Sequence, residues 1–224
     1  MDFNFKTEPY QHQLTALEDS WAASHYALLM EMGTGKTKVA LDTMVKLWEE
    51  RKISAALVIA PKGVYDNWIK NEIPTHVPTE IEPLILRWQP NISKKYEDEV
   101  SRFLFDQTGA LKIFVMNVEA FSTPKGVKMA NTFCKHHPDN LVIVDESTTI
   151  KNRKAQRTKN IVSLNKVSKY RRILTGSPIT KSPMDLFSQC LFLDKKALGF
   201  ENFFAFQARY SILARRTINN RSFQ

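Results

Sequence analysis

No apolar stretch in the 224-residue sequence approaches the roughly 20 residues that a membrane span requires. The N-terminus is neither basic nor followed by an apolar run, which argues against a secretory signal. Cysteine is also scarce: Cys134 and Cys190 stand far apart and form no paired metal-ligand spacing. We therefore expect an intracellular protein that is not secreted, contacts no membrane and carries two buried, reduced thiols.

Acidic residues are scarce in the last third of the sequence. Residues 151–224 contain sixteen Lys and Arg but only Asp185, Asp194 and Glu201, a balance of +13. Because the whole chain has a formal net charge of +9, the first 150 residues sum to −4. Such an asymmetry predicts a surface that meets a polyanion, although solvated helix surfaces would give the same count.

Repeats and low-complexity tracts are absent, and short apolar runs alternate with longer amphipathic segments. Uninterrupted runs such as Ala55-Ala56-Leu57-Val58-Ile59-Ala60 fit central parallel strands that are covered on both faces. The alternation predicts an α/β fold: a doubly wound, mainly parallel sheet with helices on both faces. We predict strands over residues 26–30, 55–60, 82–86, 112–117, 141–145 and 172–175, and helices over residues 36–50, 64–73, 93–105, 118–137, 153–164 and 183–193.

A glycine-containing turn follows the first apolar run and leads into a helix that opens with Lys36-Thr37. Gly33 and Gly35 allow the backbone N–H groups around Thr34 to turn inward toward phosphates, where a helix N-terminus adds positive potential. In this pattern Lys36 reaches the β- and γ-phosphates and the Thr37 hydroxyl binds Mg²⁺. The segment Met32-Gly33-Thr34-Gly35-Lys36-Thr37 is therefore predicted to be a phosphate-binding loop, with Met30 where the usual pattern has glycine.

An acidic pair, Asp145-Glu146, directly follows the apolar run Leu141-Val142-Ile143-Val144. A carboxylate at the end of a buried strand can hold Mg²⁺, and we assign this role to Asp145. A second carboxylate can orient the water that attacks the γ-phosphate, and we assign this role to Glu146. An isolated Asp-Glu pair more often caps a helix, but the phosphate loop upstream favours the catalytic interpretation, with Lys36 as the third catalytic residue.

Further segments make the pattern more specific. They are, in chain order, Pro9-Tyr10-Gln11, Ile59-Ala60-Pro61-Lys62, Asp145-Glu146-Ser147-Thr148-Thr149-Ile150-Lys151-Asn152 and Leu174-Thr175-Gly176-Ser177-Pro178-Ile179. In this order and spacing, the chain resembles the first RecA-like lobe of superfamily-two helicases, and most of all the Swi/Snf-type translocases of double-stranded DNA. The resemblance extends from Pro9 to about Leu193.

The resemblance implies roles for the matched positions. Gln11 would recognise the adenine of ATP, with Phe3 or Phe5 as weaker candidates for stacking on the base. Thr175 and Ser177 would couple the state of the γ-phosphate to bound nucleic acid. Contacts with the phosphate backbone of one strand are implied for Pro61, Lys62, Asn117 and Lys151, although a solvated surface lysine is the alternative for each lysine. Trp68 and Trp88 are expected to pack in the core or between domains.

Two departures from the family pattern stand out. Thr148 replaces the usual histidine, which bridges the acidic motif to the later Thr-Gly motif, so we expect a rearranged coupling contact. Motors of this kind also need a second RecA-like lobe with arginines that complete the ATP site. We expect residues 1–194 to form one lobe and residues 195–224 a basic extension toward a missing second lobe, since about thirty residues are too few for another lobe.

The sequence thus predicts the ATP-binding lobe of a nucleic-acid-dependent ATPase that uses ATP and Mg²⁺, acts on double-stranded DNA and is poorly active without its second lobe. Two alternatives stay open. One is the motor lobe of a restriction-type translocase or an RNA helicase. The other is a non-catalytic single-lobe module that binds nucleic acid or a partner, which the intact Lys36, Thr37, Asp145 and Glu146 disfavour.

Overall fold

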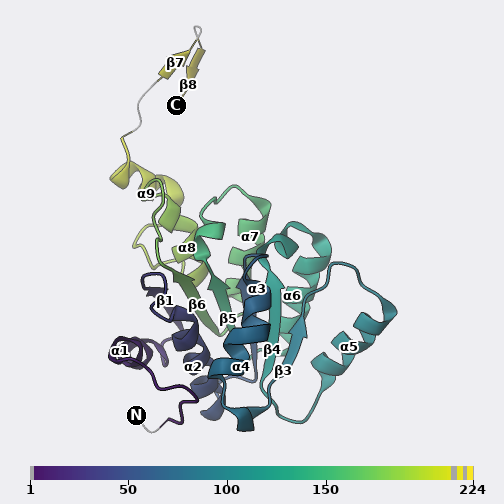
Figure 1. Ribbon diagram of the computed structural model, residues 1–224. Coiled ribbons are helices and arrows are strands. Elements are labelled where there is room, and N and C mark those ends of the chain that lie inside the picture. Colours follow the sequence, from purple (N-terminus) through teal and green to yellow (C-terminus); the bar gives the residue numbers. More distant parts are fainter. Residues whose placement is uncertain (1–2, 213–215, 219–220, 224) are drawn as a thin grey trace.

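The computed structural model describes residues 3–212, 216–218 and 221–223, and its centre is a six-stranded parallel sheet (Figure 1). The strands lie in the order β1-β6-β5-β2-β4-β3. Their bounds are β1 His25–Leu29, β2 Ala55–Ala60, β3 Leu84–Arg87, β4 Lys112–Asn117, β5 Asn140–Asp145 and β6 Tyr170–Thr175. Each of the six predicted strands is present within two residues at either end, and the predicted parallel α/β sheet is confirmed.

Helices cover both faces of this sheet, as a doubly wound fold requires (Figure 1). They are α1 Gln11–Ser20, α2 Lys36–Glu49, α3 Tyr65–Asn67, α4 Ile73–His76, α5 Lys94–Phe105, α6 Pro124–His136, α7 Gln156–Ser163, α8 Asp185–Leu193 and α9 Phe203–Tyr210. Side chains of α1 to α4 form the core on one face, and side chains of α5 to α8 form the core on the other.

Strand β2 shows why the central runs are apolar throughout. Its residues alternate between the two cores: Leu57 and Ile59 face one, and Ala56 and Val58 face the other. All six of its residues are buried. At about 25 cal/mol per Å² of apolar surface, burial on both faces stabilises such a strand more than alternation with polar residues would.

The segment 64–73, predicted as one helix, is broken into three parts. Strand β2 leads through α3 into a π-helical turn, η1 Trp68–Glu72, before α4 begins. Pro74 gives a physical reason, because it has no N–H to donate to the carbonyl of Lys70 and its ring would clash there in a regular α-helix. The wider π turn places Trp68 fully in the core.

The segment 118–137 is likewise not one helix. It begins as a 3₁₀ segment, η3 Val118–Ser122, and α6 starts only at Pro124. Thr123 precedes proline and is extended, and its hydroxyl caps α6 by accepting a hydrogen bond from Gly126 N at 3.1 Å. Gly126 is required here, since a Cβ would lie 2.2 Å from the carbonyl oxygen of Ala120.

Smaller differences follow from local chemistry. Strand β3 begins two residues later than predicted because Glu82 has a left-handed backbone (φ +44°). Helices α7 and α8 begin three and two residues later than predicted, at Gln156 and Asp185. Helices α1 and α9 were not among the predicted ones. Two further 3₁₀ segments are η2 Thr79–Ile81 and η5 Leu164–Lys166.

The basic segment 195–224 is described only in part. It contains α9 and the strand pair β7 Arg216–Ile218 and β8 Arg221–Phe223, while residues 213–215, 219–220 and 224 lie outside the described residues. Phe206 of α9 is buried, whereas Phe204 is 70% exposed. In the described part of the chain, no helix combines the length and the apolar character that a bilayer span requires.

Candidate nucleotide-binding site

The predicted phosphate loop connects β1 to α2. Gly33 and Gly35 have positive φ angles of 79° and 83°, which L-residues rarely adopt, and Gly35 caps the N-terminus of α2. Lys36 is buried, at 9% exposure, and its ammonium donates to the carbonyl oxygen of Glu31 at 2.9 Å, so the side chain is folded over the loop. Thr37 follows in the first turn of α2 and is half-buried. The backbone thus has the conformation that cradles a phosphate.

Gln13, which sequence reasoning missed, supports this loop from α1. Its side chain accepts from Tyr10 N at 3.0 Å and donates to the carbonyl oxygen of Thr34 at 3.0 Å. A Cβ at Gly35 would lie 2.2 Å from the Gln13 Nε2, so the second glycine of the loop is also a packing requirement. Gln11, the predicted adenine ligand, is exposed at the start of α1, and its role stays a prediction.

The acidic pair stands on β5, two strands from β1. Asp145 is 6% exposed, and each of its oxygens has a partner. Oδ2 accepts from Trp68 Nε1 at 2.8 Å, and Oδ1 accepts from Glu146 N at 2.9 Å. Burial raises the pKa of Asp145, while these hydrogen bonds and the charge of Lys36 oppose that rise.

Trp68 is therefore more than the core residue that the sequence predicts. It lies in the apolar core, as expected, but its indole N–H also donates to the carboxylate of Asp145, the predicted Mg²⁺ ligand. No motif spacing marks this role, since 77 residues separate Trp68 from Asp145.

Glu146 has an unusual backbone. Its φ and ψ angles of 46° and 60° lie in the left-handed region, which costs a residue other than glycine about 1 kcal/mol or more. The turn ends β5 and starts the 3₁₀ segment η4 Ser147–Ile150, so that Ser147 points into the core while Glu146 stays half-buried. Strain at this position fits a residue held for chemistry rather than for stability.

The Thr175–Pro178 segment follows β6, the strand between β1 and β5. Thr175 is buried, and its hydroxyl accepts from Ser177 N at 3.3 Å, while Ser177 is exposed. Gly176 packs directly against the phosphate-loop side, because a Cβ there would lie 3.3 Å from the backbone nitrogen of Met32. Leu29 is in register with Thr175, and Asp145 is in register with Leu174. The phosphate loop, the Thr175–Pro178 segment and the acidic pair therefore lie at the same edge of the sheet.

The hydrogen bonds around Thr148 run through its neighbour Ser147, and whether they carry the coupling expected of this segment stays a prediction. Among the described residues, the Thr148 side chain makes no hydrogen bond. Its neighbour Ser147 donates instead to Gln189 Oε1 of α8 at 2.6 Å. Gln189 Nε2 in turn donates to the carbonyl oxygen of Pro178 at 2.8 Å. Sequence reasoning missed Gln189, although a Ser-Gln pair inside an otherwise apolar helix was an available signal.

The predicted nucleic-acid residues fall into two places. Pro61 and Lys62 follow β2, and Asn117 ends the neighbouring β4, with Ala60 and Asn117 in register. The Asn117 Oδ1 is buried and has no hydrogen-bond partner. Lys151 lies elsewhere, at the end of η4, where its ammonium donates to the Thr180 hydroxyl. The structure thus brings three of the four together.

The residues proposed for Mg²⁺ suit that ion chemically. The Thr37 hydroxyl and the Asp145 carboxylate are hard oxygen ligands, and each Asp145 oxygen keeps a lone pair beyond its one hydrogen bond. In the described residues no group of three or more His, Cys, Asp or Glu side chains is arranged to hold a metal. An ion at this place would therefore take its other ligands from water and phosphate oxygens, as Mg²⁺ commonly does.

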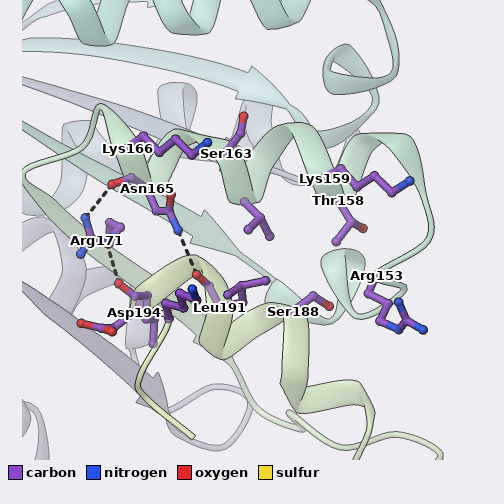
Figure 2. A pocket seen from close by; sticks show the side chains of 13 residues that line it. Arg153, Thr158, Lys159, Ser163, Asn165, Lys166, Arg171, Ser188, Leu191 and Asp194 are labelled. Carbon is purple, nitrogen blue, oxygen red and sulfur yellow. Dashed lines mark hydrogen bonds between the residues drawn. The ribbon is translucent and has the colours of Figure 1, made fainter. Parts of the chain in front are cut away.

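A cavity of about 630 Å³ lies away from these motifs, between α7 and α8 (Figure 2). Arg171 and Asn165 donate to backbone carbonyl groups on its rim, at Asn165 O and Leu191 O. None of the predicted site residues lines this cavity. The predicted nucleotide-site residues lie instead at the sheet edge formed by the phosphate loop and the acidic pair.

A phosphate loop after β1, an acidic pair after β5 and a parallel sheet between two helical layers define a phosphate-loop nucleotide-binding fold of the RecA-like type. A family model described as the SNF2-related domain matches residues 12–221. The chain belongs to this family, and the resemblance to Swi/Snf-type proteins is confirmed.

Relatives of known name agree. Over 181 residues the chain is 30% identical to the DNA repair and recombination protein RAD54-like of Mus musculus. The matched region covers 75% of this chain and 22% of that protein. Over 204 residues it is 28% identical to a Caenorhabditis elegans homologue of the SWI/SNF-related regulator of chromatin subfamily A-like protein 1, covering 90% and 26%. The chain therefore spans about a quarter or less of these relatives.

A solved structure supports the fold. The Sulfolobus solfataricus SWI2/SNF2 ATPase core in complex with dsDNA superposes with a TM-score of 0.70 at 21% identity. The match covers 93% of this chain and 40% of that one. At this identity the likeness establishes the RecA-like fold and leaves activity to the chemistry of the site.

Proposed function

We propose that this chain is the ATP-binding lobe of a double-stranded-DNA-dependent ATPase motor. The observation that carries the proposal is the phosphate loop with Lys36 at the same sheet edge as Asp145-Glu146. The relatives include proteins named as ATP-dependent helicases, which fits this reading. We expect such a motor to be intracellular, because its DNA substrate lies inside the cell.

Each residue of the site has a chemical task in this proposal. Lys36 leaves the Glu31 carbonyl and contacts the β- and γ-phosphates, with the N–H groups of Gly33 to Thr37 around them. Glu146 orients the attacking water and accepts its proton. Thr37 and Asp145 would hold Mg²⁺, which neutralises phosphate charge when bound. Gln11 contacts adenine.

Contacts with DNA are proposed for the β2–β4 end and for Lys151. Pro61 and Lys62 follow Ala60, which is in register with Asn117, and the unpartnered Asn117 Oδ1 can accept a hydrogen bond, directly or through water. Lys62 is exposed and supplies charge to a phosphate. Thr175 and Ser177 relay the state of the γ-phosphate toward this surface.

The proposed lobe spans residues 1–194, and residues 195–224 lead toward a second RecA-like lobe that supplies arginines. Because such arginines contribute about 10³–10⁵ in rate, this chain alone should bind ATP or ADP weakly and hydrolyse ATP slowly. Robust DNA-stimulated turnover by the purified chain would contradict this part of the proposal.

The binding function is tested directly with a fluorescent ATP analogue and labelled duplex, single-stranded DNA and RNA. Duplex DNA should bind most tightly. Lys62→Gln should reduce the slope of log K against log salt by about 0.9. Lys135→Gln is the matched control, since Lys135 is exposed in the last turn of α6, at the opposite sheet edge. Tighter binding of RNA would instead favour an RNA helicase.

A further inference from the structure

A buried glutamine lies in the otherwise apolar half of α8. Gln189 is fully buried, and its side-chain amide makes three hydrogen bonds. Its Oε1 accepts from the Ser147 hydroxyl at 2.6 Å, and its Nε2 donates to Pro178 O at 2.8 Å and to Asp185 O at 2.7 Å. Because a buried amide group without a partner would cost about 1–3 kcal/mol, these hydrogen bonds are needed to keep Gln189 in the core.

These bonds fix the orientation of the amide. If it were flipped, Oε1 would face the carbonyl oxygens of Pro178 and Asp185, two acceptors, and would repel both. The amide therefore joins Ser147 to Pro178 in one orientation, and neither end can shift alone without breaking a buried hydrogen bond.

The two ends belong to different functional segments. Ser147 directly follows the strained Glu146, and Pro178 ends the segment that contains Thr175 and Ser177. Helix α8 is the common frame, because the Asp185 carboxylate also accepts from Thr180 N and Lys181 N, both at 2.9 Å. A shift of the backbone at Glu146 and Ser147 would therefore reach the Thr175–Pro178 segment through one planar side-chain amide.

We propose that Gln189 is a positioning residue that couples nucleotide binding at Glu146 to nucleic-acid binding through the Thr175–Pro178 segment. The inference rests on the proposed function and names the route by which the two ligands influence each other. Gln189 itself is buried and contacts neither ligand.

The test measures coupling on this chain. The affinity for the ATP analogue AMP-PNP with Mg²⁺ is determined with and without a saturating 20-base-pair duplex, and the ratio of the two dissociation constants is the coupling factor. Coupling factors between two sites typically amount to about 5-fold or more, and we expect a value in this range for the wild type. Gln189→Leu should bring the factor close to 1 while each affinity, measured alone, changes less than about threefold.

Two further variants separate coupling from stability. Ser188→Ala alters the preceding residue of α8, whose hydroxyl lies within hydrogen-bond distance of Ile150 O at 2.6 Å and of Lys151 O at 3.0 Å but does not bond the Thr175–Pro178 segment. It should lower the melting temperature as Gln189→Leu does, yet keep the coupling factor. Ser147→Ala should lower the factor, and combining it with Gln189→Leu should lower it no further, since both break the same link.

The outcomes are distinct. If the wild type bound neither AMP-PNP nor duplex, the proposed function would be wrong. If the wild type bound both without coupling, or if folded Gln189→Leu kept the wild-type factor, the role of Gln189 would be wrong while ATP and DNA binding stood. An equal loss of coupling in Ser188→Ala would also overturn it, because a general loosening of α8 would then explain the effect.

Discussion

The indole N–H of Trp68 donates a 2.8 Å hydrogen bond to Oδ2 of Asp145. Trp68 starts the π-helical turn after β2, and Asp145 ends the neighbouring strand β5, so the bond links a residue of the apolar core to the carboxyl edge of the sheet. It fixes the carboxylate rotamer and opposes the rise in the Asp145 pKa that burial causes. A core tryptophan thus sets the geometry and the charge of the proposed metal ligand.

Replacing Trp68 by Phe should weaken Mg²⁺-dependent nucleotide binding. Phe keeps most of the apolar volume but removes the donor, so Asp145 loses its orientation and its pKa rises further. Removing a partner that orients a metal ligand typically costs 10- to 100-fold in metal affinity, and we expect a loss of about this size. Titration of a fluorescent ATP analogue at several Mg²⁺ concentrations measures it.

Trp88→Phe is the control for the loss of ring volume. Trp88 is also buried, at 3% exposure, but it packs in the other core. This variant should lose stability in urea unfolding and keep the wild-type Mg²⁺ dependence. Equal Mg²⁺ dependence in both variants would show that the indole N–H of Trp68 has no functional role.

The left-handed backbone of Glu146 predicts that a substitution which relieves the strain raises the free energy of unfolding while it abolishes hydrolysis. Glu146→Gln and Glu146→Asn both remove the carboxylate, so both should abolish hydrolysis in a complete motor. Asparagine tolerates the left-handed conformation better than glutamine, so Glu146→Asn should unfold with a free energy higher by up to about 1 kcal/mol. Urea unfolding of the two variants measures this difference, and a less stable Glu146→Asn would contradict the interpretation.

Much of this site follows from local sequence. Gly33, Gly35 and Lys36 could be assigned because a phosphate loop is a continuous segment whose backbone angles depend on its own glycines. The strands follow from apolar runs, as for β2, because burial on both faces leaves no polar position. The acidic pair is likewise read from one strand end.

The side chains that hydrogen-bond to the predicted site segments from elsewhere in the chain could not be predicted from the sequence. Gln13, Trp68 and Gln189 each make a hydrogen bond to a segment distant in the sequence, 21, 77 and 42 residues away respectively. No periodicity in the sequence indicates such pairings. The breaks at Pro74 and Thr123 were missed because the apolar pattern continues across them, although proline gave a local signal at both. Proline and the capping residue Thr123, rather than the apolar period, decide where those helices begin.

Two lysines of α2 should separate nucleotide binding from folding. Lys36 bonds a loop carbonyl, so Lys36→Met should reduce ATP-analogue affinity roughly 10- to 100-fold, as expected for a charge-assisted hydrogen bond, and change stability little. Lys38 forms a buried ion pair with Asp42 at 2.8 Å. Lys38→Met should destabilise the fold by about 3–5 kcal/mol, because it leaves a buried carboxylate unpaired.

The measurement is analogue binding and urea unfolding on both variants. Burial already raises the pKa of Asp42 in spite of Lys38, so in Lys38→Met the carboxyl should take up a proton more readily and part of the stability should return in mild acid. Folded Lys38→Met should bind the analogue like the wild type. The assignment of Lys36 would be wrong if its variant bound nucleotide normally.

His137 should make the fold sensitive to acid. His137 is 8% exposed, and its Nε2 has no hydrogen-bond partner among the described residues. Burial, aided by Lys112 and His136, lowers its pKa from 6.5 to about 4. The folded state therefore holds His137 neutral, so its contribution to stability is complete above pH 6.5 and is lost as the pH falls toward about 4. The loss should be at most about 3 kcal/mol.

His137→Phe removes the titrating group and no hydrogen bond of the ring, so urea unfolding at pH 7 and pH 4.5 should show a smaller acid loss for this variant. His136→Phe removes only the smallest of the three causes of the lowered pKa, so it should reduce the acid loss by much less than His137→Phe does. An equal reduction in both variants would assign the effect to His136 or to a general change in α6.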